Sequence, residues 1–147
     1  MKNLFLVSYF TLLSLFAFGQ EPIYAKDGIA LEGYDVVSYF EGTPMKGEKG
    51  FASEFEGVTF WFANADHLMD FEKAPLKYLP QYGGFCAYAM GKSGEKVSVN
   101  PETYLISNGK LYLFYDTLFV NTLKKWNKEG PEALQQKADD NWEAFQQ

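Results

Sequence analysis

The sequence predicts an α+β fold, in which antiparallel β-hairpins pack against a few α-helices in one small domain. Two pairs of apolar, β-rich runs are each joined by a two-residue turn, Glu56-Gly57 in the first pair and Asn108-Gly109 in the second. Asn-Gly between such runs is the strongest short-range signal for a hairpin. Other segments show helical spacing of apolar residues, and a length of 147 residues suits a single domain.

The first half of the chain contains three predicted strands. Residues 34–40 form a dense apolar and β-branched run, and a loop rich in glycine and proline follows it. Residues 51–55 and 58–63 form the first hairpin. Because side chains alternate along a strand, Phe60 and Trp61 are expected on opposite faces of the second strand of this hairpin.

A helix is predicted over residues 65–74. Asn64 suits its N-cap, because the side-chain oxygen can accept a hydrogen bond from the first free backbone N–H groups. Leu68 and Phe71 have the spacing of one buried face. Pro75 ends this helix or starts the next turn.

The second half alternates between loops, helices and one hairpin. Pro131 suits the first position of the last helix, because its missing N–H would be unpaired there in any case. The predicted elements are, in chain order, a loop at 78–84, a short helix at 85–91, a polar loop at 92–101, strands at 103–106 and 111–115, and helices at 118–128 and 131–145.

The first residues have the order of a secretory signal. Lys2 precedes a long apolar run, and the small residues Ala17 and Gly19 precede a polar restart. We therefore expect a signal peptide over residues 1–19, a mature domain over residues 20–147, and export to the periplasm or the cell exterior. A retained membrane anchor is the alternative, although the run is near the lower limit for a bilayer span. After cleavage we expect no stable membrane anchor.

The charge pattern argues against a nucleic-acid partner. The chain has 13 basic and 19 acidic residues, for a formal net charge of −6, and every basic residue is a lysine. Phosphate recognition usually uses a basic patch and the planar fork of arginine. A single cysteine, Cys86, also excludes an internal disulfide framework.

Several segments together resemble the YHS domain family. Asp35-Val36-Val37 looks like the Asp-Pro-Val opening of the family, and residues 54–79 (EFEGVTFWFANADHLMDFEKAPLKYL) look like its hairpin, capped helix and Pro-x-Lys-Tyr ending. This core covers residues 34–79. Residues 80–147 resemble the extension of exported, stand-alone bacterial members, which carry a Gly-Gly-aromatic-Cys-Ala segment like the one around Cys86.

The resemblance implies a role in metal binding, because YHS domains occur with copper-transporting ATPases and some oxygenases. The cysteine positions of related members fall on Ser38, Ala63 and His67 here, so only His67 keeps a metal-ligating side chain. Independently, Cys86, Met90 and His67 supply a thiolate, a thioether and an imidazole, the ingredients of a soft copper site. In the alternative interpretation, Cys86 and Met90 are core residues.

A second candidate site surrounds Cys86. Tyr82, Phe85 and Tyr88 bracket this residue and could line a pocket for a small ligand. A thiol enzyme would need a base within hydrogen-bond reach, and His67 is the only imidazole in the chain. Asp70 lies three residues after His67 and could orient its ring, or it could belong to a solvated acidic face.

These observations give three functional hypotheses and no complete catalytic constellation. The first is an exported accessory or binding domain for a soft metal ion, with copper as the best candidate. The second is a metal-free structural or protein-interaction module with a buried Cys86. The third is a small-ligand pocket or thiol enzyme at residues 82–88.

Overall fold

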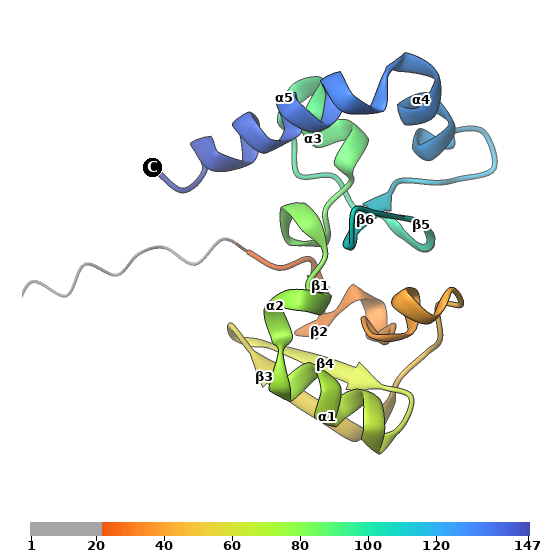
Figure 1. The fold of residues 1–147 in the computed structure, drawn as a ribbon, viewed down its shortest axis with the longest axis vertical. Coiled ribbons are helices and arrows are strands. Elements are labelled where there is room, and N and C mark those ends of the chain that lie inside the picture. Colours follow the sequence, from red (N-terminus) through yellow and green to blue (C-terminus); the bar gives the residue numbers. More distant parts are fainter. Residues whose placement is uncertain (1–21) are drawn as a thin grey trace, which may run out of the picture.

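The computed structural model describes residues 22–147 and confirms the α+β class. The expected signal peptide at residues 1–19 lies outside the described residues. Figure 1 shows two halves, with a four-stranded sheet and the helices α1 and α2 in one half and the helices α3, α4 and α5 in the other. Between residues 22 and 147, no helix is both long enough and apolar enough to span a bilayer.

The first half contains the four-stranded sheet, whose strand order is β1-β2-β4-β3. β3 and β4 form the predicted hairpin around Glu56-Gly57, and β2 pairs with β4 in parallel at Ile29 and Thr59. A register shift interrupts the β3–β4 pairing between Glu48 and Ala52. The elements of this half are β1 (Ala25–Lys26), β2 (Ile29–Ala30), η1 (Leu31–Gly33), η2 (Ser38–Glu41), β3 (Glu48–Phe55), β4 (Val58–Phe62), α1 (Ala65–Lys73) and α2 (Pro75–Tyr78).

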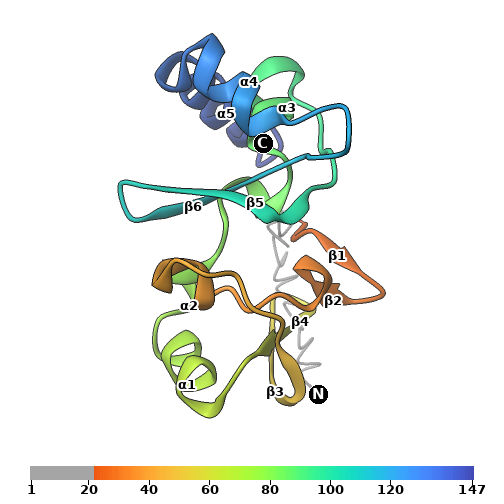
Figure 2. The ribbon, with the colours of Figure 1, turned by 90° about the vertical axis from the view of Figure 1, so that its right-hand side faces the viewer.

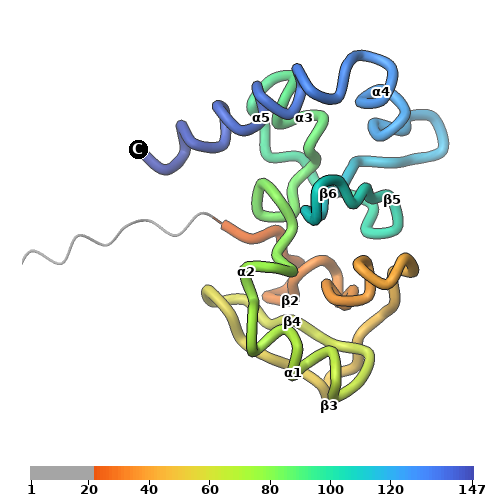
Figure 3. Tube along the Cα trace, in the orientation of Figure 1, coloured from red at the N-terminus to blue at the C-terminus, as the bar shows by residue number. Residues whose placement is uncertain are grey.

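The second half contains one hairpin and three helices. Figure 2 shows the hairpin between the first half and the helices α3, α4 and α5. Figure 3 shows the chain passing from α2 through η3 into α3. Its two strands are antiparallel and meet at the predicted Asn108-Gly109 turn. The elements of this half are η3 (Gln81–Gly84), α3 (Ala87–Ser93), β5 (Asn100–Ser107), β6 (Lys110–Phe114), α4 (Thr122–Glu129) and α5 (Pro131–Ala144).

β6 is buried on both faces and separates two hydrophobic clusters. Leu111 and Leu113 pack into the cluster of the first half, whereas Tyr112 and Phe114 pack into the cluster of the second half. Alternation along the strand explains this division, because successive side chains point to opposite faces. One strand therefore completes both cores.

Two predicted elements were wrong in ways that the local hydrogen bonds explain. Residues 34–40 do not form a strand, because the Asp35 carboxylate accepts hydrogen bonds from the N–H groups of Val37 and Ser38 and bends the chain into η2. The helix predicted over residues 118–128 begins only at Thr122, where Asn121 caps it by accepting from the N–H of Lys124.

Candidate functional site

Cys86 lies in the core between the two halves. Its side chain is fully buried, immediately before α3, and its backbone forms a bridge with Leu113 of β6. The sulfur accepts a hydrogen bond from the N–H of Tyr115 at 3.3 Å and lies 3.4 Å from the hydroxyl oxygen of Thr122. The Thr122 hydroxyl already donates to the Tyr115 carbonyl at 2.7 Å. Because the Thr122 hydroxyl donates to this carbonyl, its oxygen is free to accept from the Cys86 thiol.

His67 lies in a different environment, on α1. Its Nδ1 is 2.6 Å from Oδ2 of Asp35, and its Nε2 is 3.2 Å from Oε1 of Glu41. Burial lowers the pKa of His67, but the hydrogen bond and the charge of Asp35, together with Glu41, outweigh burial and raise that pKa above its ordinary value. An imidazolium can donate to both carboxylates, which leaves neither ring nitrogen as a metal ligand.

Asp35, rather than Asp70, orients the His67 ring. Asp35 is fully buried, and its carboxylate also accepts hydrogen bonds from the N–H groups of Val37 and Ala63 at 2.9 and 2.8 Å. Asp70 is exposed on α1, as expected for a solvated acidic face. Sequence reasoning missed this pair because Asp35 is 32 residues away from His67.

The three expected copper ligands each have partners of their own. Cys86 belongs to the first hydrophobic cluster and Met90 to the second, while His67 contacts the carboxylates of Asp35 and Glu41. Across residues 22–147, no group of three or more His, Cys, Asp or Glu side chains could hold a metal ion. The arrangement of these three residues does not fit a shared soft-metal site, and metal binding stays a prediction.

The aromatic residues near Cys86 have separate partners rather than a common pocket. Tyr82 is buried and donates its hydroxyl to Asp139 at 2.8 Å. Phe85 packs edge-on against Tyr24, and Tyr88 donates to Glu129 at 2.9 Å. A thiol enzyme at this position would also lack its imidazole base, because His67 contacts Asp35 and Glu41.

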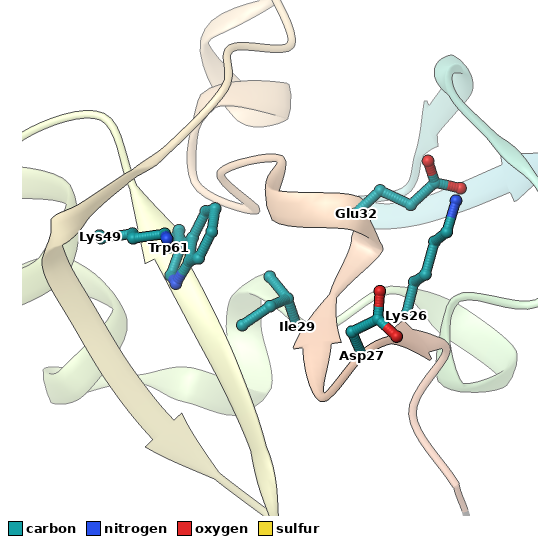
Figure 4. A pocket seen from close by; sticks show the side chains of 6 residues that line it. All are labelled: Lys26, Asp27, Ile29, Glu32, Lys49 and Trp61. Atoms are coloured by element: carbon teal, nitrogen blue, oxygen red, sulfur yellow. The ribbon is translucent and has the colours of Figure 1, made fainter.

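A pocket of about 570 Å³ lies elsewhere, beside Trp61 on the four-stranded sheet. This volume is within the range of small-molecule sites. Figure 4 shows Lys49 and Trp61 on one side of Ile29, with Asp27, Lys26 and Glu32 on the other side. The lining residues are Lys26, Asp27, Ile29, Glu32, Lys49 and Trp61.

Two glycines hold Trp61 in place. A Cβ on Gly33 would lie 2.9 Å from Cε3 of the Trp61 ring, and a Cβ on Gly47 would clash with the Trp61 carbonyl. The N–H of Gly47 also donates to the Gly33 carbonyl at 2.8 Å. The Trp61 ring therefore packs closely on Gly33, and its backbone packs closely on Gly47.

The pocket wall contains a left-handed backbone segment. Leu31, Glu32 and Gly33 have φ angles of 49°, 55° and 83°, and the first two are not glycine. Such positions cost energy and concentrate at functional sites. Contacts of Glu32 stabilise the segment: its carboxylate accepts from the Tyr24 hydroxyl at 2.9 Å, and its carbonyl accepts from Lys46 Nζ at 2.8 Å.

The pocket could not be found by motif or spacing. Its walls come from β1, β2, the turn after β2, β3 and β4, and the strands β1 and β2 have only two residues each. Alternation did predict that Trp61 faces away from the buried Phe60 and Phe62, and the structure confirms this.

Comparison with known proteins identifies no relative. No family model, no curated protein and no solved structure matches the chain. The resemblance to YHS domains therefore stays a prediction.

The Asp35–His67 pair predicts a pH-dependent stability. Because the pKa of His67 is raised in the folded protein, its stabilisation is fully present below the ordinary pKa of about 6.5 and is lost as the pH rises through the folded-state pKa. Replacing His67 by glutamine should lower the free energy of unfolding by about 3 kcal/mol near pH 6 and by less at alkaline pH. Urea unfolding across this pH range measures the difference.

The control for this experiment is Asp70→Asn, an exposed change on the same helix, which should leave the stability nearly unchanged. A difference between wild type and His67→Gln that stays constant with pH, or grows as the pH rises, would contradict a protonated His67 in the fold.

The burial of Cys86 predicts that its thiol reacts slowly in the folded protein. The native protein should react with iodoacetamide far more slowly than the protein unfolded in guanidinium, because the sulfur is fully buried and hydrogen-bonded. Mass spectrometry over time measures the modified fraction. Rapid alkylation of the native protein at neutral pH would instead revive the thiol-enzyme hypothesis.

Proposed function

We propose that this chain is an exported binding domain of the YHS type, and that its binding site is the pocket beside Trp61. The observation that carries the proposal is the composition of that pocket. An indole and an aliphatic side chain, Trp61 and Ile29, form its apolar part, and charged groups of both signs surround them. Small-ligand sites combine an apolar lining with a few placed polar groups that orient the ligand, and here the charged groups outnumber the apolar ones.

The charges suit a zwitterionic ligand. Lys49 Nζ lies 5.7 Å from the centre of the Trp61 ring, at one end of the pocket. The carboxylates of Asp27 and Glu32 lie at the other end, together with Lys26. A ligand carboxylate near Lys49 and a ligand ammonium near Asp27 and Glu32 would both meet opposite charge. An aromatic or aliphatic ligand body would then contact Trp61 and Ile29.

These requirements favour a short peptide or amino acid with an apolar side chain. Such a ligand carries an ammonium, a carboxylate and an apolar body within the size of the pocket. The close packing of Trp61 on Gly33 supports this choice, because an aromatic ring that already rests on the backbone has less freedom to lose when a ligand packs on it.

The soft-metal hypothesis is less favoured as the function of this chain. It depends on Cys86 and His67, and the hydrogen bonds and ion pairs of these two side chains already occupy the atoms that would bind a metal. The metal-free interpretation of Cys86, as a core residue, agrees with its complete burial.

Calorimetric titration with the dipeptide Phe-Gly tests the proposal. We expect binding that Trp61→Ala weakens by at least about tenfold, because the main apolar contact is lost. Acetylating the amino end or amidating the carboxyl end of the peptide should each weaken binding, because each removes one of its two charges. Lys49→Gln should remove the preference for the free carboxylate.

Lys110→Gln is the matched control for Lys49→Gln, because Lys110 is an exposed lysine outside the pocket. Adding a copper chelator should leave the affinity unchanged. No binding by any zwitterionic peptide, or affinity that survives Trp61→Ala, would show that the proposed ligand class or site is wrong.

A further inference from the structure

An exposed apolar loop tip lies in the second half of the molecule, away from the pocket. Leu118 and Phe119 are 89% and 90% exposed, so nearly all of both side chains faces solvent. In Figure 3 the chain leaves β6, runs to the outer edge of the molecule and turns back into α4. Two large apolar side chains in adjacent positions are costly to leave in water, so such a surface indicates an interaction site.

Hydrogen bonds hold this tip in one shape. The N–H of Thr117 donates to the Val120 carbonyl at 2.8 Å across the turn, and Asp116 and Asn121 form an antiparallel bridge below it. The Asp116 carboxylate accepts from the Asn121 side chain at 3.0 Å and from the Thr103 hydroxyl at 2.8 Å. Leu118 and Phe119 are therefore presented outward by an ordered turn.

The surrounding charge is positive, although the protein as a whole is acidic. Residues 116–129 contain three lysines and two carboxylates, Asp116 and Glu129, whereas the chain as a whole has a net charge of −6. Asp116 accepts hydrogen bonds from Thr103 and Asn121 at the base of the tip. Lys124, Lys125 and Lys128 are all exposed on α4, which begins one residue after the bridge. The nearby Glu129 is engaged by Lys92 at 2.8 Å.

We propose that the Leu118–Phe119 tip docks on an anionic membrane surface, with the two apolar side chains inserted at the interface and the α4 lysines against the lipid head groups. Exposed apolar side chains beside lysines are typical of interfacial membrane binding. Lysine is depleted at protein–protein interfaces, so the same surface suits a protein partner less well. The proposal does not depend on ligand binding at Trp61.

Lipid-contact quenching of a tip label tests the proposal. The mature domain over residues 20–147 is labelled with a fluorophore at Thr117→Cys, an exposed position next to the tip that leaves Leu118 and Phe119 in place. Cys86 is fully buried, so it should take up little label. We expect vesicles of phosphatidylglycerol and phosphatidylcholine that carry a nitroxide lipid to quench this label. Pure phosphatidylcholine vesicles should quench it much less. High salt should reduce the quenching, because surface charge attraction is screened.

The matched control is Leu76→Cys, labelled in the same way. Leu76 is 76% exposed, but it lies on α2 in the other half of the molecule, and its label should stay unquenched. Replacing Lys124 and Lys125 by glutamine should weaken vesicle binding by about fivefold for each lysine. Replacing Leu118 and Phe119 by serine should weaken it at least tenfold, whereas the pair Met69→Ser and Leu76→Ser should not.

Equal quenching at positions 76 and 117 would overturn the proposal, because the protein would then bind lipid without this orientation. Absence of quenching at position 117 would overturn it as well. If the tip label instead becomes shielded as protein concentration rises without vesicles, the loop is a protein interface and the lipid proposal is wrong.

Discussion

The buried carboxylate of Asp35 is the constraint on which the first half of the protein depends. A carboxylate without exposure to water is costly unless hydrogen bonds and charge compensate it. Here the N–H groups of Val37 and Ala63 and the ring of His67 all approach it within 2.9 Å. These partners come from the start of η2 and from the segment that joins β4 to α1, so one side chain ties together two regions that are 28 to 32 residues apart in sequence.

That junction also positions the pocket. Asp35 follows the left-handed segment that ends at Gly33, and Ala63 follows the strand that carries Trp61. When the Asp35 carboxylate binds the N–H of Ala63, it holds these two segments together, and Gly33 then packs against the Trp61 ring. The same side chain that orients His67 therefore supports the proposed ligand site, and we expect the Asp35–His67 pair to stabilise both.

The two halves are joined through the shared strand β6 and through η3, where Tyr82, Gly83 and Gly84 form a second left-handed segment with φ angles of 56°, 63° and 88°. β6 supplies Leu111 and Leu113 to one cluster and Phe114 to the other. The Gly83 carbonyl accepts from the N–H of Tyr24, and a Cβ on Gly84 would lie 2.8 Å from Cδ2 of Leu31. Cys86 lies at this junction, which explains its burial. The proposed lipid-binding tip and the proposed ligand pocket are consequently on different halves of one packed structure.

Local signals predicted the parts of the fold whose causes are local. The turns at Glu56-Gly57 and Asn108-Gly109, the cap at Asn64 and the first position of the last helix at Pro131 all agree with the structure. Residues 34–40 were predicted as a strand because their composition favours one, and the decisive hydrogen bonds of the Asp35 side chain leave no trace in composition.

The site was harder to predict than the fold, because it is assembled from distant segments. His67 was identified as a special residue, but its partner Asp35 could be recognised only from the folded chain. Cys86 and Met90 were candidates through their chemistry, and packing places them in two cores. Trp61 was predicted to face away from the core, but nothing in its neighbours in sequence indicates the turn at Glu32 or the two-residue strands that complete the pocket.

The most direct test of a ligand site at Trp61 is an NMR titration that follows the indole N–H signals of the three tryptophans. Trp126 of α4 is buried against Phe114 of β6, and Trp142 of α5 packs against Tyr82 of η3. Both therefore lie in the second half. Addition of Phe-Gly should shift the Trp61 indole signal and leave the other two in place. A constant Trp61 signal at saturating peptide, or a shift confined to Trp126 or Trp142, would contradict a binding site at this pocket.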